Sequence, residues 1–327
     1  MLGGAFMINP SSSSEPMPDQ TDPRTIRRVA IDQSFIKIDV MIYRQQISDL
    51  TPLVIVNSIE LPMPPSQGFC DRMWQAGYQV IFIRRPGFGG APGLPSALMA
   101  DREVQNGAAA IAEAALLQRL LETLGLKDVV LLGLGTGNSV CVRLSKLSAT
   151  VQYSIFSNPL FHQSVWDIVR PTWVQSMVRQ LLLSKGGLSF TVQGLKSVLK
   201  RRPAWFYRQF AQKSAGDLDY VAENMPDFEA AASLMQNMAS ETVYYDLQMA
   251  LVIDTDVDHS FLRGVDGIIL CGTETTEDWK RQIKTQSERL AFPIEFAPSG
   301  DLFVPYKSPD ILLEILNAAA RRAAAPG

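Results

Sequence analysis

Residues 129–139 read VVLLGLGTGNS, an apolar run followed at once by three glycines at alternate positions. The run from Val129 to Leu132 is short, continuous and apolar, which is typical of a strand buried on both faces of a parallel sheet. Glycine tolerates the backbone of a sharp turn, and a helix is expected after the third glycine. The stretch therefore predicts a buried strand, a tight turn and a helix.

Outward from this stretch, the chain alternates buried strands with helical segments. Residues 26–44 show β-type alternation on both sides of Asp32-Gln33-Ser34, which predicts an N-terminal β-hairpin. An Ala- and Leu-rich helix is expected over 104–124, ending at Gly125, and a terminal helix over 309–322. Further buried strands are expected at 53–56, 79–83, 153–156, 267–271 and 294–297.

Composition places the chain among folded globular proteins. It has 327 residues, of which 46% are hydrophobic and 19% charged, so collagen-like and wholly disordered classes are excluded. Its 30 basic and 33 acidic residues give no global positive field, so nucleic acid is not expected as a partner.

The chain divides into a tail, a core and an insertion. Residues 1–24 are rich in Ser, Pro and Gly and are expected to be a disordered tail. Residues 157–255 are helical in character and interrupt the alternation, which predicts a helical cap on a core formed by 25–156 and 256–323. The predicted class is α/β, with a doubly wound, mostly parallel sheet, the hairpin and the cap insertion.

Cysteine and histidine usage argues against disulfide and metal sites. Cys70, Cys141 and Cys271 are far apart in apolar surroundings, as reduced thiols are. His162 and His259 are the only histidines and have no ligand-spaced neighbours, so no metal is expected. No secretory leader or membrane-spanning run is recognised, which favours a cytoplasmic protein.

Three motifs resemble those of the α/β-hydrolase superfamily, over about 26–320. The segment 84–90 (RRPGFGG) is similar to the turn Asp-x-Pro-Gly-x-Gly, and 299–305 (SGDLFVP) to the segment that carries the catalytic histidine. The third is Gly133-Leu134-Gly135-Thr136-Gly137, which resembles the nucleophile elbow Gly-x-Ser-x-Gly in its strand, turn and helix context. The resemblance implies the α/β-hydrolase fold with a helical cap.

The residues that the resemblance assigns to catalysis are absent. The elbow centre is Gly135, which has no nucleophile, and the histidine position holds Asp301. The position of the orienting acid holds Thr275, and Asn158 stands at the alternative acid position after the sixth strand. The oxyanion loop, usually His-Gly, reads Asn57-Ser58. Together these substitutions predict a fold retained without its hydrolytic residues.

Other reactive groups lie near the elbow. Thr136 stands one residue past the centre, and a shift of the alignment by one residue would bring it to the apex. Ser139 and Cys141 are expected to cap or pack the helix, and His162 at the entry to the insertion to face the pocket or the surface. The alternate glycines depart from the dinucleotide fingerprint, because position 138 is Asn, and no cofactor is expected.

Two arginines and a basic aromatic stretch also stand out. Arg84 is expected to make a buried contact or to line the cleft. Lys196, Lys200, Arg201, Arg202 and Arg208 interleave with Trp205, Phe206, Tyr207 and Phe210. This stretch is expected to be a cap helix whose aromatics line the cleft and whose cations face water, or a surface for an acidic partner or a membrane.

The sequence thus favours a non-catalytic protein that binds a small apolar or amphipathic molecule, or a protein, in the cleft between cap and core. A hydrolase or lyase with a non-standard site is the alternative, a scaffold with a filled cleft is a third interpretation, and a homodimer is compatible with such a cap surface. The expected ligand-binding residues are Asn57, Ser58, Gly135, Thr136, His162 and Asp301.

Overall fold

The computed structural model describes residues 22–31, 36–88, 108–159, 161, 185–239, 242–243, 245–246, 257–258 and 260–324, so most of the predicted tail lies outside it. These residues build one eight-stranded sheet in the order β1-β2-β4-β3-β5-β6-β7-β8. The strands are β1 (Ile26–Ala30), β2 (Lys37–Ile42), β3 (Thr51–Val56), β4 (Tyr78–Arg84), β5 (Val129–Leu134), β6 (Val151–Ser157), β7 (Gly267–Gly272) and β8 (Ile294–Ala297).

The pairing confirms the predicted hairpin and the mostly parallel sheet. Strands β1 and β2 pair antiparallel, and β2 pairs antiparallel with β4, whereas the pairs from β4 to β8 are parallel. In the centre, Leu53 of β3 stands opposite Val130 of β5. All six predicted apolar runs are strands, because a strand covered by helices on both faces needs apolar side chains at successive positions.

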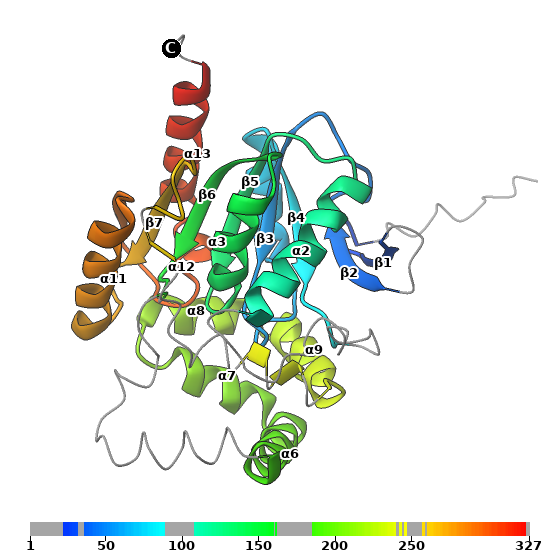
Figure 1. Cartoon of the computed structure of the whole chain (residues 1–327). Coiled ribbons are helices and arrows are strands. Elements are labelled where there is room, and N and C mark those ends of the chain that lie inside the picture. The colour runs from blue at the N-terminus through cyan, green and yellow to red at the C-terminus, as the bar shows by residue number, and fades with distance from the viewer. Residues whose placement is uncertain are drawn as a thin grey trace, which may run out of the picture.

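Helices cover both faces of this sheet, so the core has three layers (Figure 1). One face packs on α2 (Ala108–Thr123), α3 (Gly137–Leu147) and α11 (Glu277–Leu290), and the other on α1 (Gln67–Gln75) and α13 (Pro309–Ala324). Successive strand residues alternate between the two apolar clusters: Leu53 and Ile55 belong to one, Val54 and Val56 to the other. Gly125, with φ +66°, follows α2 as the sequence predicts.

The described residues between β6 and β7 form four helices, within the range 157–255 that the sequence assigns to a cap. They are α6 (Lys185–Arg201), α7 (Pro203–Ala211), α8 (Ala215–Glu223) and α9 (Met225–Gln236). Figure 1 shows them beyond the carboxyl ends of the parallel strands, where ligands bind in open α/β sheets. Within the described residues, no helix combines the length and apolarity needed to cross a bilayer.

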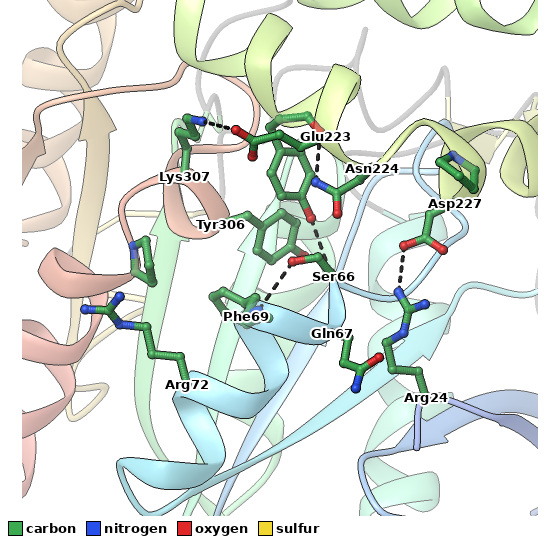
Figure 2. Close-up of a pocket in the computed structure, with 14 residues that line it drawn as sticks. Arg24, Ser66, Gln67, Phe69, Arg72, Glu223, Asn224, Asp227, Tyr306 and Lys307 are labelled. Atoms are coloured by element: carbon green, nitrogen blue, oxygen red, sulfur yellow. Dashed lines mark hydrogen bonds and ion pairs between the residues drawn. The ribbon is translucent and has the colours of Figure 1, made fainter. Parts of the chain in front are cut away.

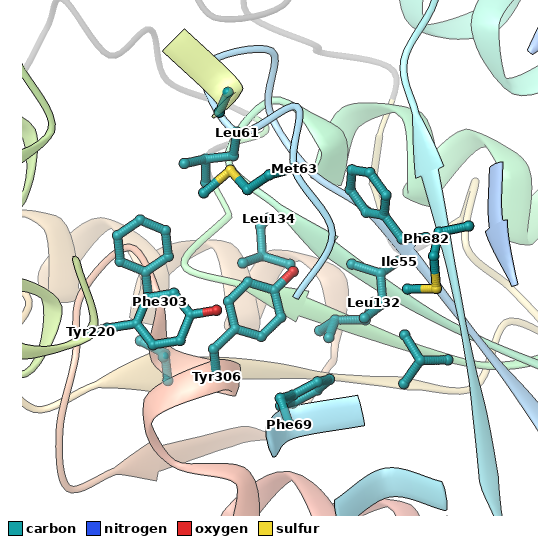
Figure 3. Packing of buried hydrophobic residues seen from close by; sticks show 14 of the residues in the cluster. Ile55, Leu61, Met63, Phe69, Phe82, Leu132, Leu134, Tyr220, Phe303 and Tyr306 are labelled. Carbon is teal, nitrogen blue, oxygen red and sulfur yellow. The ribbon is translucent and has the colours of Figure 1, made fainter. Parts of the chain in front are cut away.

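Aromatic rings join these helices to the core (Figure 3). Phe303 and Tyr306, at the short helix α12 (Val304–Lys307) after β8, pack against Tyr220 of α8 at ring-centroid distances of 5.0 and 5.7 Å. Phe228 of α9 meets Phe303 at 5.5 Å, and Phe69 of α1 meets Tyr306 at 5.0 Å. The apolar cluster is therefore continuous from the sheet face into α8 and α9.

Candidate functional site

The turn between β5 and α3 is tight, as the sequence predicts. Gly135 has φ +54°, in the left-handed region, whereas Thr136 has φ −66° and ordinary helical backbone. The Asn138 side-chain amide donates to the carbonyl oxygens of Gly135 at 3.0 Å and Ser157 at 2.8 Å, which ties the turn to β6. Gly135, and not Thr136, is therefore the residue at the apex.

The apex has no room for a side chain. A Cβ added to Gly135 would lie 2.7 Å from both Cβ and Oγ of Ser58, closer than real Cβ contacts allow. Ser58 follows β3 and is only 3% exposed. Its neighbour Asn57 accepts a hydrogen bond from the Tyr306 hydroxyl at 2.9 Å and donates to the Leu61 carbonyl. The expected oxyanion loop thus covers the elbow and is held by buried hydrogen bonds.

The two positions that the resemblance assigns to the histidine and to the orienting acid lie together. The Asn158 amide donates to Thr275 Oγ1 at 2.8 Å and to Asp301 Oδ1 at 3.0 Å, and the Thr275 hydroxyl donates to the same Oδ1 at 2.8 Å. Burial raises the pKa of Asp301, whereas its hydrogen bond with Thr275 lowers it. The structure therefore brings Asn158, Thr275 and Asp301 into one closed hydrogen-bond triangle.

The loop that carries Asp301 is anchored from α8. Asp217 accepts the backbone N–H groups of Asp301, Leu302 and Phe303 at 3.0, 2.7 and 3.1 Å. Burial raises the pKa of Asp217 to about 6, and the three N–H donors oppose that rise. Glu274, after β7, accepts hydrogen bonds from Ser214 at the start of α8 and from Ser299 in the loop after β8. A second carboxylate therefore connects α8 with this loop.

A buried ion cluster contacts the elbow at Thr136. The Arg85 guanidinium makes a bidentate pair with Glu113 at 2.8 and 3.0 Å, donates to Thr136 Oγ1 at 2.8 Å, and contacts Asp246. The Thr136 hydroxyl donates to Asp246 in turn. Burial lowers the pKa of Arg85, but the two carboxylates outweigh that effect and raise it. The Thr136 hydroxyl therefore both accepts and donates a hydrogen bond within the cluster.

Arg84 and Arg85 have different roles that the sequence did not separate. Arg84 pairs with Asp39 of β2 at 3.1 Å and donates to the Pro62 carbonyl at 2.9 Å. These contacts are partly buried, which is closer to the buried contact expected for it than to a side chain that lines the cleft. The cluster of Arg85 was missed, because Glu113 and Asp246 lie 28 and 161 residues away in the chain. The only available signal was the pair of arginines after an apolar strand.

Glu60 is a further titratable residue at the elbow that sequence reasoning missed. Its Oε1 lies 3.8 Å from the Cβ position of Gly135. Burial and the charge of Asp246 raise its pKa to about 7, although a hydrogen bond with Ser58 and the charge of Arg85 lower it. The bare apex is therefore faced by Ser58 and by a carboxyl group that titrates near neutral pH.

The other candidate nucleophiles are packed inside α3. Ser139 and Cys141 are buried, and burial raises the pKa of the Cys141 thiol, which disfavours the thiolate. His162 and His259 lie outside the described residues. In the described part of the chain, no three His, Cys, Asp or Glu side chains are placed to share a metal ion.

A cavity of about 610 Å³ opens where α1, the α8–α9 corner and α12 meet (Figure 2). None of the described residues expected to bind ligand lines it. Tyr306 connects the cavity with the expected ligand-binding residues, since it lines the cavity while its hydroxyl donates to Asn57. The lining residues are Arg24, Ser66, Gln67, Gly68, Phe69, Arg72, Tyr220, Glu223, Asn224, Pro226, Asp227, Tyr306, Lys307 and Pro309.

The wall of the cavity combines aromatic rings with charged groups. Arg24, which the sequence placed in the tail, pairs with Asp227 at 2.6 Å, and Lys307 pairs with Glu223 at 3.2 Å. The Tyr220 hydroxyl accepts the Ser66 N–H at 3.4 Å, next to the N-terminus of α1. Such a wall suits a molecule that has both apolar and polar parts.

Comparison with known proteins finds similarity in structure alone. No protein-family model matches the sequence, and no curated protein matches it. A thermophilic esterase from Thermogutta terrifontis superposes with a TM-score of 0.58 at 15% identity, over 92% of this chain and 100% of that one. An enol-lactonase from Burkholderia xenovorans LB400 gives 0.59 at 11% identity, over 90% and 100%.

A bromoperoxidase from Bacillus anthracis is similar as well, with a TM-score of 0.56 at 14% identity over 91% of this chain and 100% of that one. At such identities the likeness bears on the fold and leaves the activity open. The strand order, the elbow and these structures agree, and the chain has the α/β-hydrolase fold.

Proposed function

We propose that this protein is a non-catalytic member of its fold class, which binds a small amphipathic molecule at the seam between the predicted cap (157–255) and the core. One observation carries the proposal: the apex of the elbow is Gly135, and Ser58 occupies the space that a nucleophile would need. Acyl transfer by an elbow residue requires a side chain that projects from this apex toward the substrate.

The residues at the positions that the resemblance assigns to the base and the acid support the same conclusion. Asp301 accepts hydrogen bonds from Thr275 and Asn158, so its carboxylate is already engaged by its neighbours. Asp217 holds the backbone of the same loop from α8. A catalytic base needs free access to the proton that it removes, whereas this arrangement stabilises a closed loop.

The cavity at the seam is the site that we assign to the ligand. Its volume lies within the range of about 300–1,000 Å³ that small-molecule sites occupy. Phe69, Tyr220 and Tyr306 offer apolar ring surface, and Arg24 and Lys307 offer charge. An amphipathic molecule would place its apolar part on the rings and its polar end at the charged rim.

The first experiment tests for catalysis. The protein is incubated with a fluorophosphonate and examined by intact mass, beside turnover of p-nitrophenyl esters and a heat-denatured control. No adduct and no turnover above the control are expected. Covalent labelling together with turnover would overturn the non-catalytic proposal.

The second experiment tests the cavity. Gly68 lines it, and a Cβ there would meet no atom within 4 Å, so Gly68→Trp fills the space without displacing the wall. Native mass spectrometry is expected to show a retained small molecule on the parent chain and its loss in this variant. Gly186→Trp, at a second open glycine outside the cavity, is the matched control and is expected to retain the molecule. Equal retention by both variants would exclude the cavity as the site.

A second candidate function is a hydrolase or lyase with a non-standard site, and one observation favours it. Ser58 Oγ lies 2.7 Å from the Cβ position of residue 135 and shares a hydrogen bond with Glu60, whose pKa is about 7. A serine beside a carboxyl group that titrates near neutrality is a pairing that general-base catalysis can use. Labelling that disappears in Ser58→Ala would establish this candidate.

A further inference from the structure

The helices α6 and α7 carry a concentrated positive charge. Residues 185–216 contain seven Lys and Arg and no Asp or Glu, in a chain whose formal net charge is −3. The rest of the chain therefore has a net negative charge, whereas this stretch has a net positive one. Figure 1 shows α6 at the end of the molecule away from the sheet, and α7 contacts it.

Three of these cations lie at the corner between the two helices, Lys200, Arg201 and Arg202, and a fourth, Arg208, lies in the last turn of α7. Lys200, Arg201, Arg202 and Arg208 are all exposed. Among the residues that the structure describes, none of the four has an acidic side chain within ion-pair distance. Their charges are thus available to a partner outside the chain.

Aromatic side chains stand among these cations and face outward. Trp205 is 50% exposed and lies one helical turn from Arg208. On α6, Phe190 is 76% exposed and lies three turns before Arg201, on the same side of the helix. These exposed rings therefore offer apolar surface beside the cations.

The opposite sides of both helices are buried against the rest of the protein. Val192 and Leu199 of α6 are buried, as are Tyr207 and Ala211 of α7, and Tyr207 packs against Phe228 of α9 at 4.8 Å. The exposed aromatics are therefore not part of the packing that holds the helices in place. We name the outward side the basic aromatic face, formed by Phe190, Lys200, Arg201, Arg202, Trp205 and Arg208.

From this arrangement we infer that the basic aromatic face docks on the surface of a bilayer that contains anionic lipid. Helices that present Lys and Arg together with Trp and Phe bind in the interface of membranes, where the cations meet lipid phosphates and the rings enter the headgroup layer. The charge complements an anionic surface, and the indole of Trp205 suits the boundary between apolar and polar layers. This inference is independent of the proposed function, because its residues lie outside the elbow and the cavity.

The test is co-sedimentation of the full chain with vesicles. Vesicles of phosphatidylcholine alone are compared with an equimolar mixture of phosphatidylcholine and phosphatidylglycerol, at low and at high salt. Binding to the anionic vesicles that weakens with salt is expected, with little binding to the zwitterionic ones. No binding to anionic vesicles would overturn the inference.

Variants with matched controls locate the surface. Removing Arg201, Arg202 and Arg208 together as R201Q/R202Q/R208Q is expected to weaken binding roughly a hundredfold, at about fivefold per cation. The control K127Q/K284Q/R321Q removes the same charge from exposed positions elsewhere and is expected to bind like the parent. Equal loss in both triple variants would show a non-specific charge effect and contradict the inference.

The aromatic contribution is tested separately. Trp205→Ala is expected to weaken binding to anionic vesicles, whereas Phe296→Ala, at an exposed aromatic of β8, is expected to leave it unchanged. Circular dichroism confirms that each variant is folded. Capture by poly-glutamate without vesicle binding would assign the face to an acidic protein instead and overturn the lipid inference.

Discussion

At the scale of single residues, Gly135 and Ser58 decide what the elbow can do. The backbone of Gly135 has a positive φ, and the space beyond its Cα is occupied by Ser58. Glycine is the residue that accepts both conditions at once, since it has no Cβ to clash and no penalty for the left-handed region. The apex therefore has no side chain of its own, and Ser58 fills the space beyond it.

Restoring the usual serine at the apex is therefore expected to destabilise the protein. Gly135→Ser combines a left-handed non-glycine backbone with overlap against Ser58, and a loss of about 2–4 kcal/mol in the free energy of unfolding is expected. Urea unfolding measures the loss. Gly125→Ser is the control, because Gly125 has φ +66° but no atom within 4 Å of a new Cβ, so that only the backbone term, about 1–2 kcal/mol, is expected.

The double variant Ser58→Gly with Gly135→Ser separates the two causes. Removing the Ser58 side chain opens the space above the apex, so the double variant is expected to recover the overlap term and to resemble Gly125→Ser in its loss. If Gly135→Ser is as stable as the parent, the elbow has more room than the 2.7 Å contact indicates.

Glu60 gives the elbow a pH dependence whose sign follows from its pKa. Burial and Asp246 raise that pKa from 4.5 to about 7. Between these values the unfolded chain releases the proton while the folded chain keeps it, so stability falls as pH rises through the window and then stays level. The ionised carboxylate is the form that the folded protein disfavours.

Replacing Glu60 by Gln is expected to remove this penalty. At about pH 8 the variant is expected to be more stable than the parent by about 1–2 kcal/mol, and near pH 4 the two are expected to be similar. The gain is smaller than a full pKa shift would give, because Glu60 as a whole residue keeps intermediate exposure to solvent, which screens its charge. Thermal unfolding across the pH range measures it, with Glu229→Gln as an exposed control. A difference that does not change with pH would contradict the assignment.

At the scale of secondary-structure elements, α8 is attached to the loop after β8 through one carboxylate. Asp217 accepts three successive backbone N–H groups, from Asp301 to Phe303. These three N–H groups have no acceptor in a strand or helix, so the Asp217 carboxylate accepts the hydrogen bonds that regular secondary structure would otherwise accept. The loop that would present a catalytic base is thereby fixed to α8.

Asp217→Asn tests this attachment. An amide cannot accept at both ends, so at least one N–H loses its acceptor, and a loss of about 1–3 kcal/mol is expected at about pH 8. Hydrogen exchange at residues 301–303 is expected to accelerate at the same time. Asp219→Asn, an exposed acid on the same helix, is expected to change neither. Unchanged exchange in the Asp217 variant would show that the loop is held by other contacts.

Secondary-structure elements differ in how directly sequence patterns predict them. Buried parallel strands such as β5 are continuous apolar runs, and the pattern predicts them directly. Helix α1 gives a weaker signal, because it is nine residues long and has no acidic residue in its first turn. Its stability depends on the Ser66 cap and on the packing of Phe69 and Met73, so tertiary contacts decide whether it forms.

At the scale of the whole molecule, aromatic packing joins the predicted cap to the core. Phe228 is fully buried, and its ring lies near those of Tyr207, Tyr220 and Phe303 at 4.8, 6.1 and 5.5 Å. Rings from both parts therefore share one apolar cluster. A shared cluster favours unfolding of the two parts in one transition.

Truncating Phe228 tests this coupling. Phe228→Ala is expected to lower the free energy of unfolding by about 3–5 kcal/mol, with near-UV and far-UV circular dichroism still changing together. Phe190→Ala removes an exposed ring and is expected to change stability by less than about 0.5 kcal/mol. Two separate transitions in the parent would show that α6–α9 unfold independently of the core.

The sequence by itself determined the mostly parallel sheet, the N-terminal hairpin and the strand, turn and helix around Gly135. These features depend on local patterns of apolar residues and glycine, which a chain carries in its order. Only the tertiary structure decided that Ser58 fills the apex, that Arg85 meets Glu113 and Asp246, and that the large cavity lies beside α1. Each of these depends on side chains that are distant in sequence, and their proximity follows from packing in three dimensions.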